Sequence, residues 1–142
     1  MDVRKVYVDA SVVLRRILKQ PGALEDWLTA ETAVASELLQ VEALRTLDRF
    51  RVTGKLSDAE MAAAVGELKI YVAAFEQVPI DSGVLRRASG AFPTPLGTLD
   101  AIHLATALIW IESNSEDLVL FTHDRQLAAA ARAWGLEVKT AP

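Results

Sequence analysis

The stretch VYVDASVVL, residues 6–14, joins a strand-like run to a helix-like run through a single aspartate, Asp9. Its first valines alternate with a more amphipathic neighbour, which predicts a short strand over residues 3–9. Ser11 is a good N-cap for a helix that continues to about residue 18. Asp9 therefore lies where a strand ends and a helix begins, which is where parallel sheets place their sites.

Working outward, helix-like and strand-like segments alternate along the chain. The expected helices cover residues 25–30, 36–54, 57–74, 82–91, 98–111 and 125–134, and the expected strands cover residues 33–35, 78–80, 118–121 and 136–139. Ser57 and Glu60 form a capping box, and Thr98 is placed to cap another helix. Pro79 confines its strand to an edge of the sheet. This alternation predicts an α/β fold, with a parallel sheet covered by helices on both faces.

Composition narrows the class of protein. The 142 residues are 51% hydrophobic and 24% charged, which predicts one compact domain over residues 1–142. The absence of cysteine excludes a disulfide scaffold, a thiolate zinc site and a cysteine nucleophile. The net charge of −4 gives no global attraction to nucleic acid. We see no signal peptide and no membrane span, so we expect a cytoplasmic protein.

Three further acidic residues lie beside apolar segments: Glu42 in SELLQVEALR, Asp100 in GTLDAIHLATA and Asp124 in LVLFTHDRQL. Burying a carboxylate is unfavourable unless it is paired, hydrogen-bonded or bound to a metal. Asp124 follows a late strand as Asp9 follows the first, so both belong at the same edge of the sheet. Together the four acids predict an oxygen-only cage for Mg²⁺ or Mn²⁺.

Each acid also has a simpler interpretation. Asp9 could cap the first helix, although Ser11 is available for that role. Glu42 could pair on the surface with Arg45 or Arg49, and Asp124 could cap the helix that follows it. Asp100 lies in the first turn of a helix that is apolar almost all round, where the helix dipole favours an ionised carboxylate.

Two histidines and three hydroxyl residues accompany the acids. His103 is three residues after Asp100, and we expect it to be a buried, hydrogen-bonded core residue. His123 is expected near the site or at the surface rather than on a metal. The hydroxyls either cap helices or orient a carboxylate or a water molecule; they are Ser11, Thr98 and Thr122.

Taken together, these motifs resemble the PIN-domain family, and most closely its small bacterial toxin ribonucleases of the VapC type. The resemblance is carried by VDASV at 8–12, the glutamate of SELLQVEALR at 36–45, LDAIHLATA at 99–107 and FTHDRQLAAAA at 121–131. These motifs cover nearly the whole chain and occur in the family's order. His123 is a mild departure, at a position that looks variable in the family.

The resemblance implies a three-layer α/β/α fold with a central, mostly parallel sheet. It implies a Mg²⁺- or Mn²⁺-dependent endoribonuclease, the toxin of a toxin–antitoxin pair, whose acidic site is formed by Asp9, Glu42, Asp100 and Asp124. It also implies a homodimer formed through the helices within residues 33–74, and a cognate antitoxin that threads a segment, with an arginine, across the active-site groove. The RNA would be single-stranded or looped, and its phosphates could be gripped by Arg15, Arg16, Arg86 or Arg87.

Several other classes of protein share part of this pattern. A haloacid-dehalogenase-type phosphatase expects a second acid two residues after Asp9, where this chain has Ser11. A response-regulator receiver needs a paired early acid and a late lysine, neither of which is evident, and the chain has no phosphate-binding Gly-x-x-x-x-Gly-Lys loop. Two alternatives stay open: a non-catalytic PIN-like module that binds RNA or protein, and a DNA-cutting nuclease of the same class.

Overall fold

The computed structural model describes residues 5–140, and its centre is a five-stranded sheet in which every pairing is parallel. The strand order is β3-β2-β1-β4-β5. The strands are β1 (Lys5–Val8), β2 (Thr32–Ser36), β3 (Glu76–Val78), β4 (Val119–Phe121) and β5 (Glu137–Lys139). The part of the first predicted strand that precedes Lys5 lies outside the described residues.

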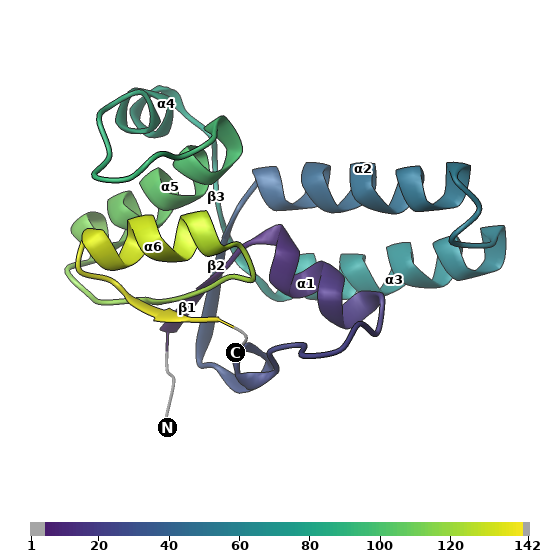
Figure 1. Cartoon of the computed structure of the whole chain (residues 1–142). Helices are drawn as coiled ribbons and strands as arrows, with labels where there is room; N and C mark the ends of the chain where they lie inside the picture. The colour runs from purple at the N-terminus through teal and green to yellow at the C-terminus, as the bar shows by residue number, and fades with distance from the viewer. Residues whose placement is uncertain (1–4, 141–142) are drawn as a thin grey trace.

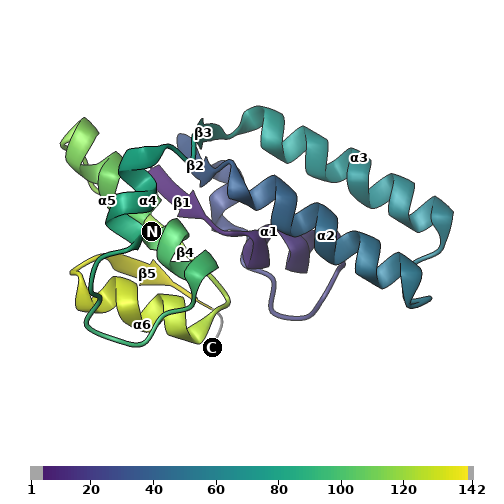
Figure 2. The ribbon, with the colours of Figure 1, turned by 90° about the horizontal axis from the view of Figure 1, so that it is seen from above.

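Six α-helices and one 3-10 turn surround the sheet (Figure 1). They are α1 (Ala10–Ile17), η1 (Asp26–Thr29), α2 (Leu38–Val52), α3 (Asp58–Ala74), α4 (Ser82–Ala88), α5 (Thr98–Asn114) and α6 (Arg125–Ala133). Helices α1, α2 and α3 cover one face of the sheet, and α5 and α6 cover the other, with α4 packed on α5 (Figures 1 and 2). None of the helices in this part of the chain has the length and apolar character needed to cross a membrane.

The two faces of β1 explain why its sequence is apolar throughout. Val6 and Val8 point into the cluster that α1, α2 and α3 complete, whereas Tyr7 points into the cluster under α5 and α6. All three side chains are fully buried. A strand covered by helices on both faces has no polar side, as expected in a parallel sheet. The predicted three-layer α/β/α architecture is thereby confirmed.

Most predicted elements are present, with shifted ends. The edge position of β3 is confirmed, although the strand covers Glu76–Val78 rather than residues 78–80, so Pro79 lies just beyond it. The Ser57–Glu60 capping box is also confirmed. Helix α4 stops at Ala88 rather than near residue 91, and α5 continues to Asn114 rather than ending at residue 111.

Two predicted caps are wrong. Helix α1 is capped by Asp9, and Ser11 lies inside its first turn. Helix α5 begins at Thr98 itself, so Gly97 occupies the N-cap position and provides no side-chain cap. A third cap is partly right: the hydroxyl of Ser36 accepts a hydrogen bond from the Leu38 amide at 3.1 Å, although Ser36 is still the last residue of β2.

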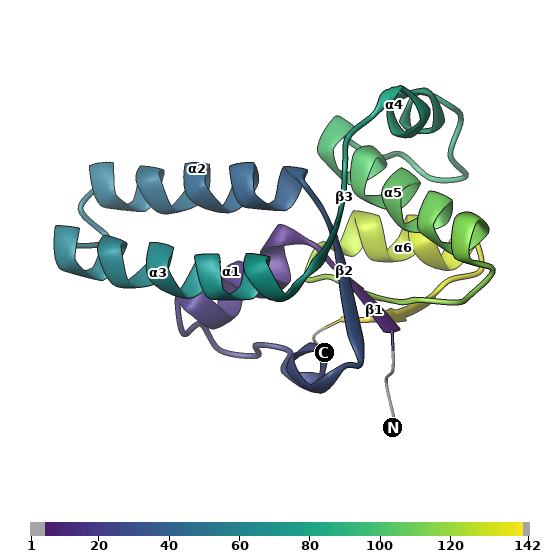
Figure 3. The ribbon, with the colours of Figure 1, turned by 180° about the vertical axis from the view of Figure 1, so that it is seen from behind.

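Helices α2 and α3 form a long antiparallel hairpin that extends away from the sheet, as the view from behind shows most clearly (Figure 3). Their mutual face buries Leu47 and Leu68. Large apolar side chains remain on the outer faces: Val41 is 58% exposed, and Val52 and Ile70 are each 70% exposed. The hairpin therefore offers apolar surface beyond what the core of the chain uses.

Candidate active site

The acidic residues gather at the point where the strand order reverses. From β1 the chain goes outward to β2 and β3 on one side, then returns to β4 and β5 on the other. Val8 pairs in register with Phe121, so β1 and β4 end side by side. Asp9 directly follows β1, and Asp124 follows β4 after a two-residue link. Crevices at such switch points are where open parallel sheets bind their ligands.

Asp9 is held by three hydrogen bonds from different parts of the chain. Its Oδ1 accepts from the Ser11 hydroxyl at 2.5 Å and from the Val12 amide at 3.3 Å. Its Oδ2 accepts from the Thr122 hydroxyl, also at 2.5 Å. An ionised carboxylate has about four lone-pair sites. Three are therefore occupied, and one on Oδ2 is left for a further partner.

Burial and hydrogen bonding act on Asp9 in opposite directions. The side chain is only 4% exposed. Burial raises the pKa of Asp9, and the charge of His103 together with the Ser11 and Thr122 hydroxyls pulls it back down. The net effect is a raised pKa, because desolvation of the carboxylate outweighs its contacts. A cation beside Asp9 would offset this desolvation.

Thr122 links the ends of the two central strands. Besides donating to Asp9, its hydroxyl accepts a hydrogen bond from the Asp124 amide at 2.9 Å. Ser11 makes a parallel link, because its hydroxyl accepts from the His123 amide at 2.9 Å. The β4–α6 link is thus tied to the start of α1 by two hydroxyl bridges. These are the orienting roles weighed for Ser11 and Thr122.

Asp124 is the N-cap of α6. Its Oδ1 accepts from the Gln126 amide at 2.8 Å and from the Leu127 amide at 3.0 Å. The simpler interpretation of this residue is therefore correct as far as it goes. The cap also fixes the carboxyl group next to Asp100, which enters from the first turn of α5.

The carboxyl group of Asp100 also has a raised pKa. Burial raises the pKa of Asp100 from 3.8 to about 7, helped by the charge of Asp124, by a hydrogen bond with it and by the charge of Asp9. The charge of His103 opposes the shift. Three aspartates therefore lie close enough to repel one another. This is the electrostatic situation that a bound divalent cation relieves.

Glu42 is positioned by a buried histidine. Its Oε1 lies 2.5 Å from Nε2 of His103, whose Nδ1 lies 2.7 Å from the Tyr7 hydroxyl. A carboxylate only accepts, so Nε2 carries a proton; Nδ1 accepts from the Tyr7 hydroxyl when the ring is neutral and donates to it when the ring is protonated. The expectation that His103 is a buried, hydrogen-bonded residue is confirmed, with 1% of it exposed. Glu42 is not paired with an arginine of its own helix, since Arg45 bonds Asp48 instead.

Charges around His103 favour its protonated form. Burial lowers the pKa of His103, but its hydrogen bond to Glu42 and the charges of Glu42, Asp9 and Asp100 together raise it above 6.5. Tyr7, in contrast, has a pKa well above 10 because of its complete burial. Tyr7 is not among the residues that the motifs point to. Its one signal was a hydroxyl-bearing side chain in an otherwise aliphatic buried strand.

The donor set fits a hard cation, although the side chains do not form a ready cage. Within residues 5–140, no three or more His, Asp or Glu side chains are arranged as ligands of a metal ion. Three lone pairs of Asp9 accept hydrogen bonds, and Glu42 Oε1 is hydrogen-bonded to His103. All the candidate donors are nevertheless carboxylate oxygens, which Mg²⁺ and Mn²⁺ prefer. One or two carboxylates with several waters suffice for Mg²⁺.

The arginines predicted to bind phosphate differ in the hydrogen bonds and ion pairs that they already form. Arg16 is bonded to Tyr71 and Glu25, and Arg87 forms a two-pronged pair with Glu112. Arg15 donates to the Pro21 carbonyl. The pKa of His123 is lowered mainly by burial and, to a smaller extent, by the charge of Arg15. The charge of Arg15 therefore acts beside Asp124, the residue that follows His123.

Comparison with known proteins agrees with this geometry. The PIN domain family model matches residues 6–133. Ribonuclease VapC46 of Mycobacterium tuberculosis is 33% identical over 137 residues, covering 94% of this chain and 95% of that protein. Ribonuclease VapC35 of the same species is 33% identical over 139 residues, covering 94% of each chain. The toxin–antitoxin complex from Klebsiella pneumoniae contains a chain with a TM-score of 0.66 and 17% identity, over 96% of this chain and 97% of that one. The resemblance noted in the sequence is confirmed: this chain belongs to the PIN-domain family.

Proposed function

We propose that this protein is a metal-dependent endoribonuclease that acts as the toxin of a toxin–antitoxin pair. The observation that carries the proposal is the convergence of Asp9, Asp100 and Asp124 at the switch point of the sheet, where mutual repulsion and burial raise the pKa of Asp100 to about 7. Membership of the PIN family and similarity to chains named VapC ribonucleases support the choice of RNA as substrate.

The proposed site assigns separate roles to the four acids. Asp9, through its remaining lone pair, and Asp100 and Asp124 would hold Mg²⁺ or Mn²⁺. Glu42 would complete the set from α2, oriented by His103. When bound, the cation would lower the pKa of a water molecule and neutralise charge at the scissile phosphate. Neither histidine is needed as a general base in this arrangement.

The protein's own contribution is positioning. The Ser11 and Thr122 hydroxyls fix both oxygens of Asp9, so the remaining lone pair has one direction. The α6 cap fixes Asp124 in the same way through Oδ1. Fixed ligands orient the scissile bond for in-line attack without reorganisation during the reaction. Single-stranded or looped RNA suits such a site, because its backbone is accessible.

The test is cleavage of single-stranded RNA by the purified chain with Mg²⁺ or Mn²⁺, compared with Asp9→Asn, Asp100→Asn and an exposed-acid control, Asp117→Asn. Cleavage by wild type and control, lost in both site variants and in EDTA, would support the proposal. Cleavage that survives Asp100→Asn would contradict the site. Specific RNA binding without cleavage would favour a non-catalytic PIN-like binding module. Cleavage of DNA in the same assay would favour a DNA-cutting nuclease of the same class.

The partners belong to the same proposal. The outer faces of α2 and α3, with Val41 and Ile70 largely exposed, would form a homodimer interface. A cognate antitoxin would cover the acidic groove and bring a cationic side chain to the aspartates. This part rests on the resemblance to VapC-type toxins. Co-purification with the product of a neighbouring reading frame, and loss of nuclease activity on adding it, would test the antitoxin.

A further inference from the structure

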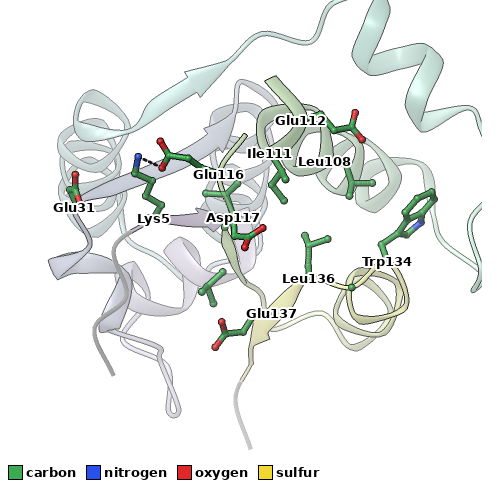
Figure 4. Close-up of a pocket in the computed structure, with 13 residues that line it drawn as sticks. Lys5, Glu31, Leu108, Ile111, Glu112, Glu116, Asp117, Trp134, Leu136 and Glu137 are labelled. Carbon is green, nitrogen blue, oxygen red and sulfur yellow. Dashed lines mark ion pairs between the residues drawn. The ribbon is translucent and has the colours of Figure 1, made fainter. Parts of the chain in front are cut away.

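A hollow lies at the opposite edge of the sheet from the aspartates. It has a volume of about 790 Å³ and is lined by residues at the amino ends of β1, β4 and β5, by the end of α5 and by the loop after it (Figure 4). Lys5 and Val119 are the first residues of their strands. At about 3.3 Å per residue, even these short strands separate the two edges by roughly 7 to 10 Å. The proposed nuclease chemistry makes no use of this pocket.

The floor of the pocket is apolar. Leu108 and Ile111 reach it from α5, and Leu136 rises between them and the β5 edge (Figure 4). Trp134, just after α6, forms one side and is 41% exposed. The other two tryptophans, Trp27 and Trp110, are 3% and 6% exposed. An indole left open beside an aliphatic floor is the kind of anchor surface that protein interfaces use.

The rim of the pocket is strongly acidic. Five carboxylates line it against one ammonium group, that of Lys5 among the described residues, and the acids are Glu31, Glu112, Glu116, Asp117 and Glu137. They come from separate segments: the residue before β2, the end of α5, the α5–β4 loop and β5. Lys5 is itself paired with Glu116. The pocket therefore keeps a negative potential that its own cation does not cancel.

The chain already shows how this surface holds a guanidinium. Arg87 places its Cζ atom 5.5 Å from the centroid of the Trp134 ring. The same guanidinium donates to both carboxylate oxygens of Glu112, at 2.8 and 2.9 Å. Indole face and carboxylate thus cooperate at the pocket's margin, through a cation–π contact and a two-pronged ion pair.

We propose that this pocket is a docking site for a basic segment of a partner protein, with arginine or lysine side chains and one apolar side chain between them. The rim would take the cations, and the floor beside Trp134 would take the apolar group. RNA is disfavoured because its phosphates would meet Glu31, Asp117 and Glu137, which neither Lys5 nor Arg87 pairs. A small polyamine would satisfy the rim but leave the apolar floor uncovered.

Docking there would leave the acidic edge of the sheet accessible. Basic segments are common in proteins that bind nucleic acid. A partner of that kind would bring the enzyme to the RNA on which the partner sits, a consequence that, unlike the docking itself, rests on the proposed function.

The experiment uses a synthetic peptide in which arginines alternate with serines around one central leucine. Binding to the full chain is followed by tryptophan fluorescence, with Trp134→Phe identifying the reporter, and by calorimetry. The test variant is Asp117→Asn with Glu137→Gln at the rim. The matched control is Asp58→Asn with Glu67→Gln on α3, which makes the same change of charge far from the pocket.

We expect saturable binding to wild type and control, and binding about ten-fold weaker to the rim variant. Replacing the peptide's leucine with serine should weaken binding by a similar factor, and higher salt should weaken it further. Equal affinity for rim and control variants would overturn the proposal, as would no binding to wild type. Spermine that binds as tightly as the peptide would make the pocket a polyamine site instead. A change from dimer to monomer in Trp134→Ser would assign it to a second copy of the chain.

Discussion

Replacing Asp100 with asparagine should stabilise the fold while removing the proposed activity. The pKa of Asp100 is raised from 3.8 to about 7 by burial and by the neighbouring aspartates. At about 1.4 kcal/mol for each tenfold change in proton affinity, that displacement corresponds to about 4 kcal/mol. Asp100 is only partly buried, so solvent screens part of this effect and we take roughly half, about 2 kcal/mol. Asparagine keeps the shape of the side chain and carries no charge.

The sign of the pH dependence follows from the direction of the shift. The folded chain holds the Asp100 proton more tightly than the unfolded chain does, so ionising this group favours unfolding. Ionisation of Asp100 lowers the free energy of unfolding by its full amount above pH about 7. This destabilisation declines as the pH falls below the pKa of the folded state and vanishes below about pH 3.8. The advantage of Asp100→Asn over wild type should therefore be largest near pH 8 and close to zero near pH 4.

The assay is urea unfolding without divalent metal at several pH values, with Asp117→Asn as the control because that acid is exposed and belongs to the opposite edge. Near pH 8 we expect a gain of about 2 kcal/mol, or about 5 °C in Tm. Adding Mn²⁺ should stabilise wild type and the control by mass action but not Asp100→Asn. Burial and repulsion of Asp100 would be refuted as a source of instability if Asp100→Asn were no more stable than wild type near pH 8. They would also be refuted if the gain in the free energy of unfolding were the same near pH 8 and near pH 4.

Three further substitutions test other links. Thr122→Val should lower the free energy of unfolding by about 1 to 3 kcal/mol, because Asp9 loses a buried hydrogen-bond donor; urea unfolding measures it, and an unchanged midpoint would contradict the role of that bridge. His103→Leu should cost a similar amount and weaken Mn²⁺ binding in calorimetry, since Glu42 loses its positioning partner; unaltered metal affinity would remove Glu42 from the site. Ile70→Asp should leave unfolding nearly unchanged at this 70% exposed position but shift sedimentation from dimer to monomer, and a persistent dimer would place the interface elsewhere.

The layer order and the acidic edge were predictable because they depend on local patterns. Valines alternating before Asp9, and the apolar run before Thr122, fix where β1 and β4 end whatever the rest of the chain does. The capping box at Ser57 is equally local, since both of its partners lie within one turn. Parallel pairing then brings strand ends together without any further information.

The wrong caps and the missed pairs have a common physical origin. Ser11 and Asp9 are both good N-caps, and the choice between them is made by Thr122, whose hydroxyl bonds Asp9 from the far end of the chain. Local spacing suggests arginines of the same helix as partners of Glu42, whereas its actual partner, His103, lies on α5. Such choices depend on contacts between distant segments, which a pattern within one segment does not encode.

The simple and the functional interpretations of the aspartates are therefore compatible. Asp9 and Asp124 cap α1 and α6, and Asp100 lies in the first turn of α5, so the amino ends of three helices face one small region. Each helix end carries partial positive charge, which stabilises a carboxylate and explains how the fold tolerates three of them together. Capping accounts for Asp9 and Asp124. Asp100 makes no cap, since Gly97 holds that position, and burial together with the neighbouring aspartates raises its pKa to about 7. The case for a cation site consequently rests most heavily on Asp100, the one aspartate of the three that the helix caps do not explain.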